Sequence, residues 1–234
     1  MVEELDLETY LYVSPNKLEI YLFDKNNLNN LYEDKIKFIN NTNHIDFNIL
    51  DKFLEKNIFK IEKLAGNFIK NIFLIIENNE SNQVNFGIKK KNYENIINDK
   101  FLQNILIDAK DLFRENYKNN NIMHILIMRY FENDKYHSSF SDEFRGNYLC
   151  IEFQFKYISD KFISEINKVL KKYQVELTGC FDSKYVKSYF VTEQIPFPEM
   201  VYKIKRGINE NEVKLISKNI ENRGFFEKFF QLFS

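Results

Sequence analysis

Hydrophobic and polar positions in the first third of the chain follow the period of a strand and then that of a helix. Short apolar or alternating segments predict three strands, at 10–13, 18–23 and 34–39. The turn-forming sequence Ser14-Pro15-Asn16 lies between the first two strands and predicts a hairpin. After them, apolar residues recur every three or four positions, which predicts a helix from its N-cap Asp46 to its C-cap Gly66.

A continuous apolar run at 68–76 predicts a strand buried inside a sheet. The resulting β-β-β-α-β order is typical of a layered α/β unit. The same alternation resumes over 82–173 and predicts a β-α-β-β-α module inserted into the first unit. Its predicted strands and helices lie at 84–90, 98–118, 122–131, 148–158 and 160–170.

The chain is then predicted to return to the first unit through a strand at 175–180 and a short helix at 183–190. We therefore expect four parts: a first unit of residues 1–81 and 174–195, the inserted module 82–173, a linker 196–223 and a terminal helix 224–234. Pro196 and Pro198 are interpreted as stopping the preceding element, and one short strand is expected at 213–216. The predicted fold class is α/β (α+β).

Charge and composition exclude some classes of protein function and indicate a folded protein. Lys and Arg number 33 against 34 Asp and Glu, a net charge of -1, so the whole chain has no electrostatic attraction for nucleic acid. A hydrophobic content of 44% is typical of a folded protein. Two cysteines cannot form a disulfide framework, which indicates a reducing compartment such as the cytoplasm.

Motifs for catalysis, cofactors and metals are absent from the sequence. The six glycines never cluster, so neither common phosphate-binding loop can form. His124 lies in an apolar segment and is interpreted as a core histidine, while Cys150 and Cys180 are interpreted as small buried hydrophobes. We therefore assign no catalytic, cofactor-binding or metal-binding residue.

The pattern of residues 224–234 is strongly amphipathic. At about 100° per residue, phenylalanine and leucine gather on one face of a helix, and basic residues flank it. Such a helix is typical of an in-plane membrane anchor. The alternative is that this helix packs on its own domain. The predicted membrane-binding residues are Arg223, Phe225, Phe226, Lys228, Phe229, Phe230, Leu232 and Phe233.

The order of elements from 68 to 190 resembles the bacterial cell-division actin homologue FtsA, where its first subdomain joins the inserted SHS2-type subdomain 1C. The segments that carry the resemblance are 72–76 (IFLII), 109–112 (AKDL), 122–127 (IMHILI), 149–153 (LCIEF), 160–170 (DKFISEINKVL) and 173–177 (YQVEL). The Phe-rich end is similar to that family's membrane-targeting helix. The resemblance implies half of an actin-like fold with an inserted SHS2-like module.

The turn after the first strand departs from the FtsA family. Members carry an Asp-x-Gly phosphate loop there, whereas residues 13–17 read Val-Ser-Pro-Asn-Lys. Without the aspartate, a hydrated magnesium ion loses its anchor. The second half of the actin-like fold and the subdomain that binds FtsZ have no counterpart. We therefore do not expect ATP binding or FtsZ recruitment.

The resemblance implies a non-enzymatic, membrane-associated scaffold of bacterial cell division, without a cofactor. Its implied location is the cytoplasmic face of the inner membrane, on the inner leaflet. Its implied partners are division proteins such as an FtsN-like tail, or further FtsA-like copies in a homo-oligomer.

Two alternatives to the cell-division scaffold remain open, which makes three hypotheses in all. The same fold resembles pilus and secretion-assembly proteins of the PilM type, whose ligand is a short cytoplasmic peptide that can add to an exposed strand. The third hypothesis is a small enzyme whose site is assembled from scattered acidic residues.

Overall fold

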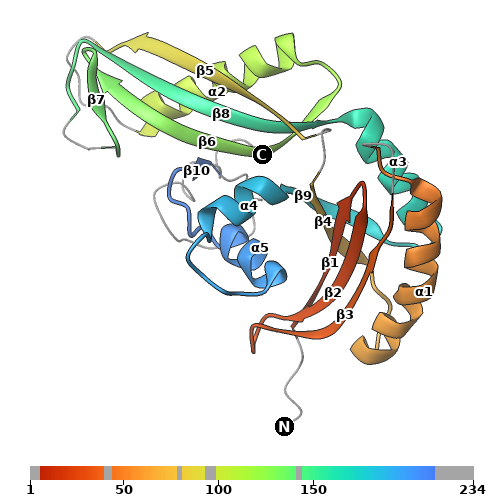
Figure 1. Cartoon of the computed structure of the whole chain (residues 1–234). Coiled ribbons are helices and arrows are strands. Elements are labelled where there is room, and N and C mark those ends of the chain that lie inside the picture. The colour runs from red at the N-terminus through yellow and green to blue at the C-terminus, as the bar shows by residue number, and fades with distance from the viewer. Residues whose placement is uncertain (1–5, 40–43, 78–80, 93–98, 141–143, 214–234) are drawn as a thin grey trace. The chain divides into compact units, whose positions relative to one another are not determined.

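The computed structural model describes residues 6–39, 44–77, 81–92, 99–140 and 144–213. The chain divides into two compact units (Figure 1). Unit 1 comprises Met1–Asn82 and Ile158–Ile208, and unit 2 comprises Gln83–Tyr157 and Asn209–Ser234. Each unit is described by itself.

A five-stranded mixed sheet of order β3-β2-β1-β4-β9 forms the centre of unit 1. The strands are β1 (Leu7–Ser14), β2 (Lys17–Asp24), β3 (Asn29–Lys37), β4 (Asn71–Ile76) and β9 (Glu176–Asp182). The first three strands pair antiparallel, whereas β4 runs parallel to both β1 and β9. The predicted hairpin, third strand and buried strand are therefore confirmed.

Helices cover both faces of this sheet. Helices α1 (Phe47–Ala65) and α3 (Asp160–Lys171) lie together on one face, and α4 (Ser183–Tyr189) and α5 (Phe197–Lys205) lie on the other (Figure 1). Both faces of β1 are consequently buried, with Tyr10, Leu11, Tyr12 and Val13 at most 3% exposed.

The caps of α1 are those that the sequence predicts. The Asp46 carboxylate accepts hydrogen bonds from the backbone N–H groups of Asn48 and Ile49. Gly66 adopts φ +72, the left-handed conformation that ends a helix at low cost for glycine. The buried face of the helix carries Leu50, Phe53, Leu54, Ile58 and Ile61.

Unit 2 is a sheet of order β10-β6-β8-β5 that packs on one long helix. Its elements are β5 (Asn82–Lys91), α2 (Asp99–Asn116), β6 (Asn120–Glu132), β7 (Lys135–His137), β8 (Tyr148–Ser159) and β10 (Glu212–Val213). Apolar residues of α2 and the sheet form a core rich in phenylalanine, with Phe113, Phe153 and Phe155 at most 2% exposed.

Two expectations about organisation differ from the structure. Residues 196–223 were expected to form a linker, but Phe197–Lys205 forms α5, because Pro196 and Pro198 occupy its N-terminal cap and first turn, where proline is well tolerated. The 160–170 helix was assigned to the inserted module. In the structure α3 contacts α1 and β9 of unit 1, with the Phe47 and Phe162 ring centroids 5.9 Å apart.

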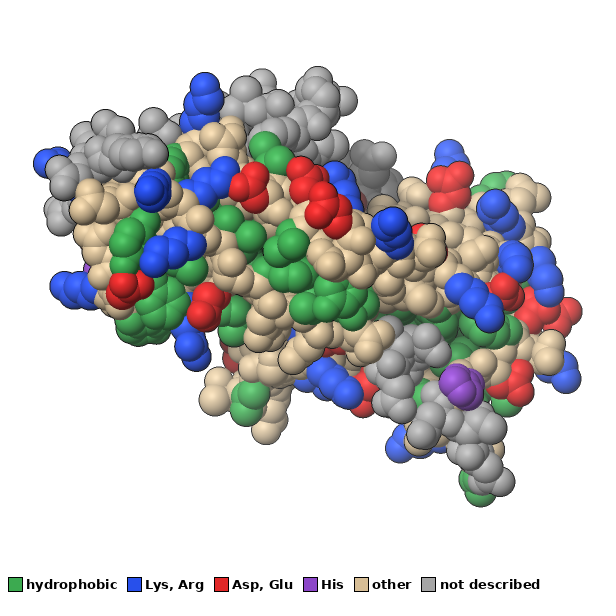
Figure 2. Space-filling view, turned by 90° about the horizontal axis from the view of Figure 1, so that it is seen from above, with side chains coloured by type: hydrophobic (Ala, Val, Ile, Leu, Met, Phe, Trp, Pro, Cys, Tyr) green, Lys and Arg blue, Asp and Glu red, His purple; other side chains and the backbone are tan. Residues whose placement is uncertain are grey.

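The surface agrees with the balanced charge of the sequence. Basic and acidic side chains are interspersed over the face that Figure 2 shows. Within the described ranges, none of the helices has the length and apolar character needed to cross a membrane.

Candidate functional site

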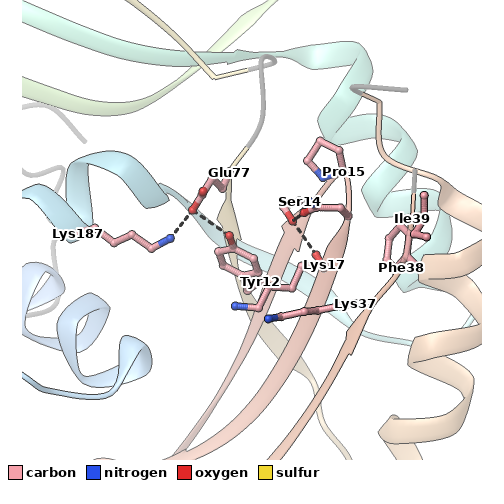
Figure 3. Close-up of a pocket in the computed structure, with 10 residues that line it drawn as sticks. Tyr12, Ser14, Pro15, Lys17, Lys37, Phe38, Ile39, Glu77 and Lys187 are labelled. Carbon is pink, nitrogen blue, oxygen red and sulfur yellow. Dashed lines mark hydrogen bonds and ion pairs between the residues drawn. The ribbon is translucent and has the colours of Figure 1, made fainter. Parts of the chain in front are cut away.

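A pocket of about 730 Å³ lies in unit 1 at the carboxyl ends of β1 and β4, with the β1–β2 turn on one side and Lys187 of α4 on the other (Figure 3). Carboxyl ends of parallel strands are the usual place for ligands in α/β sheets. The lining residues are Tyr12, Ser14, Pro15, Asn16, Lys17, Lys37, Phe38, Ile39, Glu77 and Lys187. We call it the lysine pocket.

The hairpin turn shapes one wall of the lysine pocket. Ser14 pairs with Lys17 across the two-residue turn, and the Ser14 hydroxyl donates to the Lys17 carbonyl at 3.0 Å. The backbone N–H of Phe38 donates to the Asn16 carbonyl at 3.0 Å and attaches the end of β3 to the turn. The backbone of the turn is therefore held by β2 and β3.

Sheet register brings two lysines together at this wall. Lys17 of β2 is the direct partner of Lys37 of β3, and their side chains extend next to each other in Figure 3. Lys17 also contacts Glu19 at 2.7 Å, whereas Lys37 makes no ion pair with any residue of the described ranges. Like charges directly opposite each other destabilise a sheet, so an anion between them would be favourable.

Glu77 is the only carboxylate among the lining residues that the structure describes, and three side chains of unit 1 already bind it. It accepts from the Tyr12 hydroxyl at 2.8 Å, from the Ser183 hydroxyl at 2.6 Å and from the Lys187 ammonium. Burial alone would raise the pKa of Glu77, but the hydrogen bonds from Lys187, Ser183 and Tyr12 outweigh it and lower the pKa to about 2. Glu77 is therefore ionised and internally neutralised.

Asp182, at the carboxyl end of the neighbouring strand β9, is also engaged. Its carboxylate accepts from the backbone N–H of Tyr185 at 2.6 Å and caps α4, and it accepts from the Ser81 hydroxyl. Glu77 and Asp182 thus each have a structural role at this edge of the sheet.

The side chains that line the lysine pocket do not fit a magnesium–nucleotide complex, which is the ligand that the resemblance to an actin-like fold would imply. Magnesium is held through oxygen ligands, chiefly carboxylates and phosphates, and needs open coordination positions on them. The described lining of the lysine pocket offers three ammonium groups and one carboxylate, whose Oε2 already accepts three hydrogen bonds. In the part of the chain that the structure describes, no three His, Cys, Asp or Glu side chains are grouped to hold a metal ion. This charge distribution suits an anion that contacts the lysines directly.

The predicted membrane-binding residues, from Arg223 to Phe233, lie outside the described residues. The 13–17 turn stands out in the sequence because it lacks Asp and Gly, but no sequence pattern indicates the lysine pocket. Lys17, Lys37, Glu77 and Lys187 are far apart in the sequence and form no motif. Lys17, directly after the predicted turn, is the sole local sequence signal of this pocket.

Comparisons with known proteins place this chain by its fold. A chain of the PilM–PilN type IV pilus biogenesis complex superposes with a TM-score of 0.50 and 8% identity, over 79% of this chain and 49% of that one. A Bacteroides thetaiotaomicron protein with an actin-like ATPase fold and unknown function matches with a TM-score of 0.31 and 14% identity, over 82% and 59%. The cytoplasmic domain of EpsL, an inner membrane component of the Vibrio cholerae type II secretion system, matches with a TM-score of 0.35 and 6% identity, over 76% and 56%.

The chain therefore spans about half the length of the structures that it resembles. No protein-family model matches the sequence, and no curated protein matches it. The predicted fold class is confirmed: the protein has a mixed α/β architecture, and its fold is similar to part of the chain from the PilM–PilN complex.

Proposed function

We propose that this protein is a non-enzymatic adaptor of a membrane-associated assembly platform, on the cytoplasmic face of the inner membrane. It binds an acidic peptide segment of a partner protein in the lysine pocket, and it does so without ATP. The observation that carries this proposal is the charge of the described lining, which holds three lysines and one carboxylate, Glu77, that Lys187 already neutralises.

The geometry of the lysine pocket favours a carboxylate-bearing peptide as its ligand. The Lys17–Lys37 pair points at one volume, so two acidic side chains, or one bidentate carboxylate, would offset the repulsion between the two ammonium groups. About 730 Å³ is enough space for a few residues of an extended segment. An acidic peptide also needs no magnesium ion, for which the described lining offers no carboxylate besides Glu77.

The fold supports the assembly-platform part of the proposal. The structural likeness at a TM-score of 0.50 is to a chain of a complex of type IV pilus biogenesis. Because identity is 8%, this likeness concerns the fold, and the adaptor role is our inference.

A labelled peptide of alternating Glu and Gly residues is expected to bind the full chain and to lose affinity when the pocket lysines are removed. Lys37→Ala should weaken binding about two- to fivefold, and Lys17→Ala with Lys37→Ala about tenfold, because each exposed ion pair contributes about 0.2–1 kcal/mol. Fluorescence anisotropy measures these affinities, and added salt should weaken them through screening.

The matched control for these variants is Lys60→Ala, which removes an exposed lysine of α1 that does not line the pocket. It should bind the peptide as the unmodified chain does. Equal affinities for all variants would contradict the proposal. So would a calorimetric titration in which ATP with magnesium binds and displaces the peptide.

We further propose that residues 224–234 attach the protein to the inner leaflet. Each buried phenylalanine contributes up to about 1.5–3 kcal/mol, less when burial at the interface is partial. A chain that ends at Asn222 should stay folded by circular dichroism but stop co-sedimenting with anionic liposomes. If the shortened and full chains sediment alike, the membrane role is wrong and self-packing of this segment is favoured.

A second candidate function is an FtsA-like scaffold of bacterial cell division. The Phe-rich pattern of 224–234 favours it, because this pattern resembles the membrane-targeting helix of that family. Pull-down with an FtsN-like tail against a pilus-type peptide would separate the two candidates. In cells, a fluorescently tagged chain at mid-cell would favour division, and polar foci would favour pilus assembly.

A further inference from the structure

The ammonium groups of the lysine pocket gather at one end of it. The nitrogens of Lys17 and Lys187 lie 5.1 and 5.5 Å from the centroid of the Tyr12 ring. Lys37, the partner of Lys17 across β2 and β3, extends toward the same end in Figure 3. An acidic side chain that enters the pocket is therefore attracted to this charged end.

The other end of the described lining is apolar. Pro15 of the hairpin turn and Phe38 and Ile39, which follow β3, lie there, away from the ammonium groups in Figure 3. The hydrogen bond from the Phe38 backbone N–H to the Asn16 carbonyl, 3.0 Å long, attaches this apolar end to the turn.

Ile39 is the most exposed large apolar side chain of the described ranges, at 97%. Single exposed apolar residues are common on protein surfaces and by themselves indicate nothing. Ile39, however, lines a pocket together with three lysines, and it lies two residues after one of them, Lys37. A ligand attracted by the lysines is thus brought next to apolar surface that it can cover.

We propose that the ligand of the lysine pocket is a peptide in which an aliphatic residue lies two positions from an acidic pair, and that its aliphatic side chain packs on Pro15, Phe38 and Ile39. This inference rests on the function proposed above and names the class of its partner peptide. In an extended peptide, side chains at positions i and i+2 point to the same side. One face of such a ligand can therefore meet both Lys37 and Ile39.

The aliphatic contact should contribute to affinity at least as much as one ion pair does. Half-burial of a leucine side chain corresponds to about four- to tenfold in affinity, and one exposed ion pair to about fivefold or less. Salt screens the ion pairs but not the apolar contact. The lysines therefore select acidic ligands, and the apolar end discriminates among them.

Three fluorescein-labelled peptides test this inference on the full chain. GGGEGEGGG carries only the acidic pair, whereas GGGEGEGLG and GLGEGEGGG add a leucine two positions after or before it. One leucine peptide should bind about four- to tenfold more tightly than GGGEGEGGG in fluorescence anisotropy. Added sodium chloride should weaken all three while it leaves this ratio unchanged.

The three affinities also separate this inference from the function on which it rests. If GGGEGEGGG binds and neither leucine peptide binds more tightly, the inference is wrong and recognition of acidic peptides by the lysines stands. If none of the three peptides binds, the proposed function is wrong as well.

Ile39→Ser should abolish the advantage of the leucine peptide and leave the affinity for GGGEGEGGG unchanged. Because Ile39 is 97% exposed, this variant is expected to fold as the unmodified chain does. The matched control is Phe59→Ser, since Phe59 is 73% exposed and does not line the pocket; it should keep the advantage.

A leucine advantage that persists in Ile39→Ser would overturn the inference. So would a dimer in light scattering that Ile39→Ser dissociates, because a second copy of the chain would then cover the apolar end.

Discussion

Phe155→Ala is expected to lower the free energy of unfolding of unit 2 by about 3–5 kcal/mol, the range for removing a fully buried phenylalanine. Phe155 is 0% exposed. Its ring stacks on Phe113 at a centroid distance of 5.3 Å and meets Phe86 edge-on at 5.4 Å. A third ring, Phe153, lies at a centroid distance of 6.3 Å. The variant therefore loses apolar burial and three ring contacts, and it leaves a cavity between α2 and the sheet.

Unfolding in urea, monitored by hydrogen exchange, would measure the loss of unfolding free energy within unit 2 itself. Exchange resolved along the chain is needed because a protein of two units does not have to unfold in one step. Phe59→Ala is the matched control, since Phe59 on α1 is 73% exposed and its loss should change stability by less than about 0.5 kcal/mol. If Phe155→Ala were as stable as Phe59→Ala, the described core of unit 2 would be wrong.

Glu77→Gln is expected to lower the free energy of unfolding of unit 1 by about 1–2 kcal/mol at pH 7 and to remove part of its acid sensitivity. The pKa of Glu77 is about 2 in the folded chain against an ordinary 4.5. A carboxylate with a lowered folded pKa stabilises fully above its unfolded pKa, and this contribution disappears as pH falls from about 4.5 to about 2. The side chain is 35% exposed, so solvent screening reduces the effect below that of a fully buried ion.

Chemical denaturation at pH 7, 4.5 and 2.5 would measure both parts of this prediction. The unmodified chain should lose more stability than Glu77→Gln between the two acidic values. Glu176→Gln, which alters an exposed glutamate of β9, serves as the control and should follow the unmodified chain. Identical acid profiles for the unmodified chain and Glu77→Gln would mean that the contacts with Tyr12, Ser183 and Lys187 contribute no net stability.

Local signals were sufficient to predict most of the elements. The Ser14-Pro15-Asn16 turn predicted the first hairpin, because few residues other than these suit a tight turn. Asp46 and Gly66 predicted both ends of α1, because capping depends on a side chain and a backbone conformation next to each other in sequence. Strand β7 was missed, since three residues carry too little periodicity to be recognised.

The tertiary structure decided where the elements pack and which charged groups meet. The sequence indicated that Pro196 and Pro198 end the preceding element. In the structure they begin α5, because proline, which ends one element, is also well suited to the first turn of the next helix. α3 is equally amphipathic whichever unit it joins, so its pattern could not show that it packs on α1.

The sequence by itself determined the hairpin, the capped helix and the absence of an Asp-x-Gly turn, because each depends on neighbouring residues. Only the tertiary structure decided the lysine pocket and the His124–Glu212 contact. Strand register sets Lys17 opposite Lys37, and the parallel order of β1, β4 and β9 brings Glu77 and Lys187 to the same edge of the sheet. Contacts between residues so distant in sequence depend on how strands and helices pair, which no local pattern encodes.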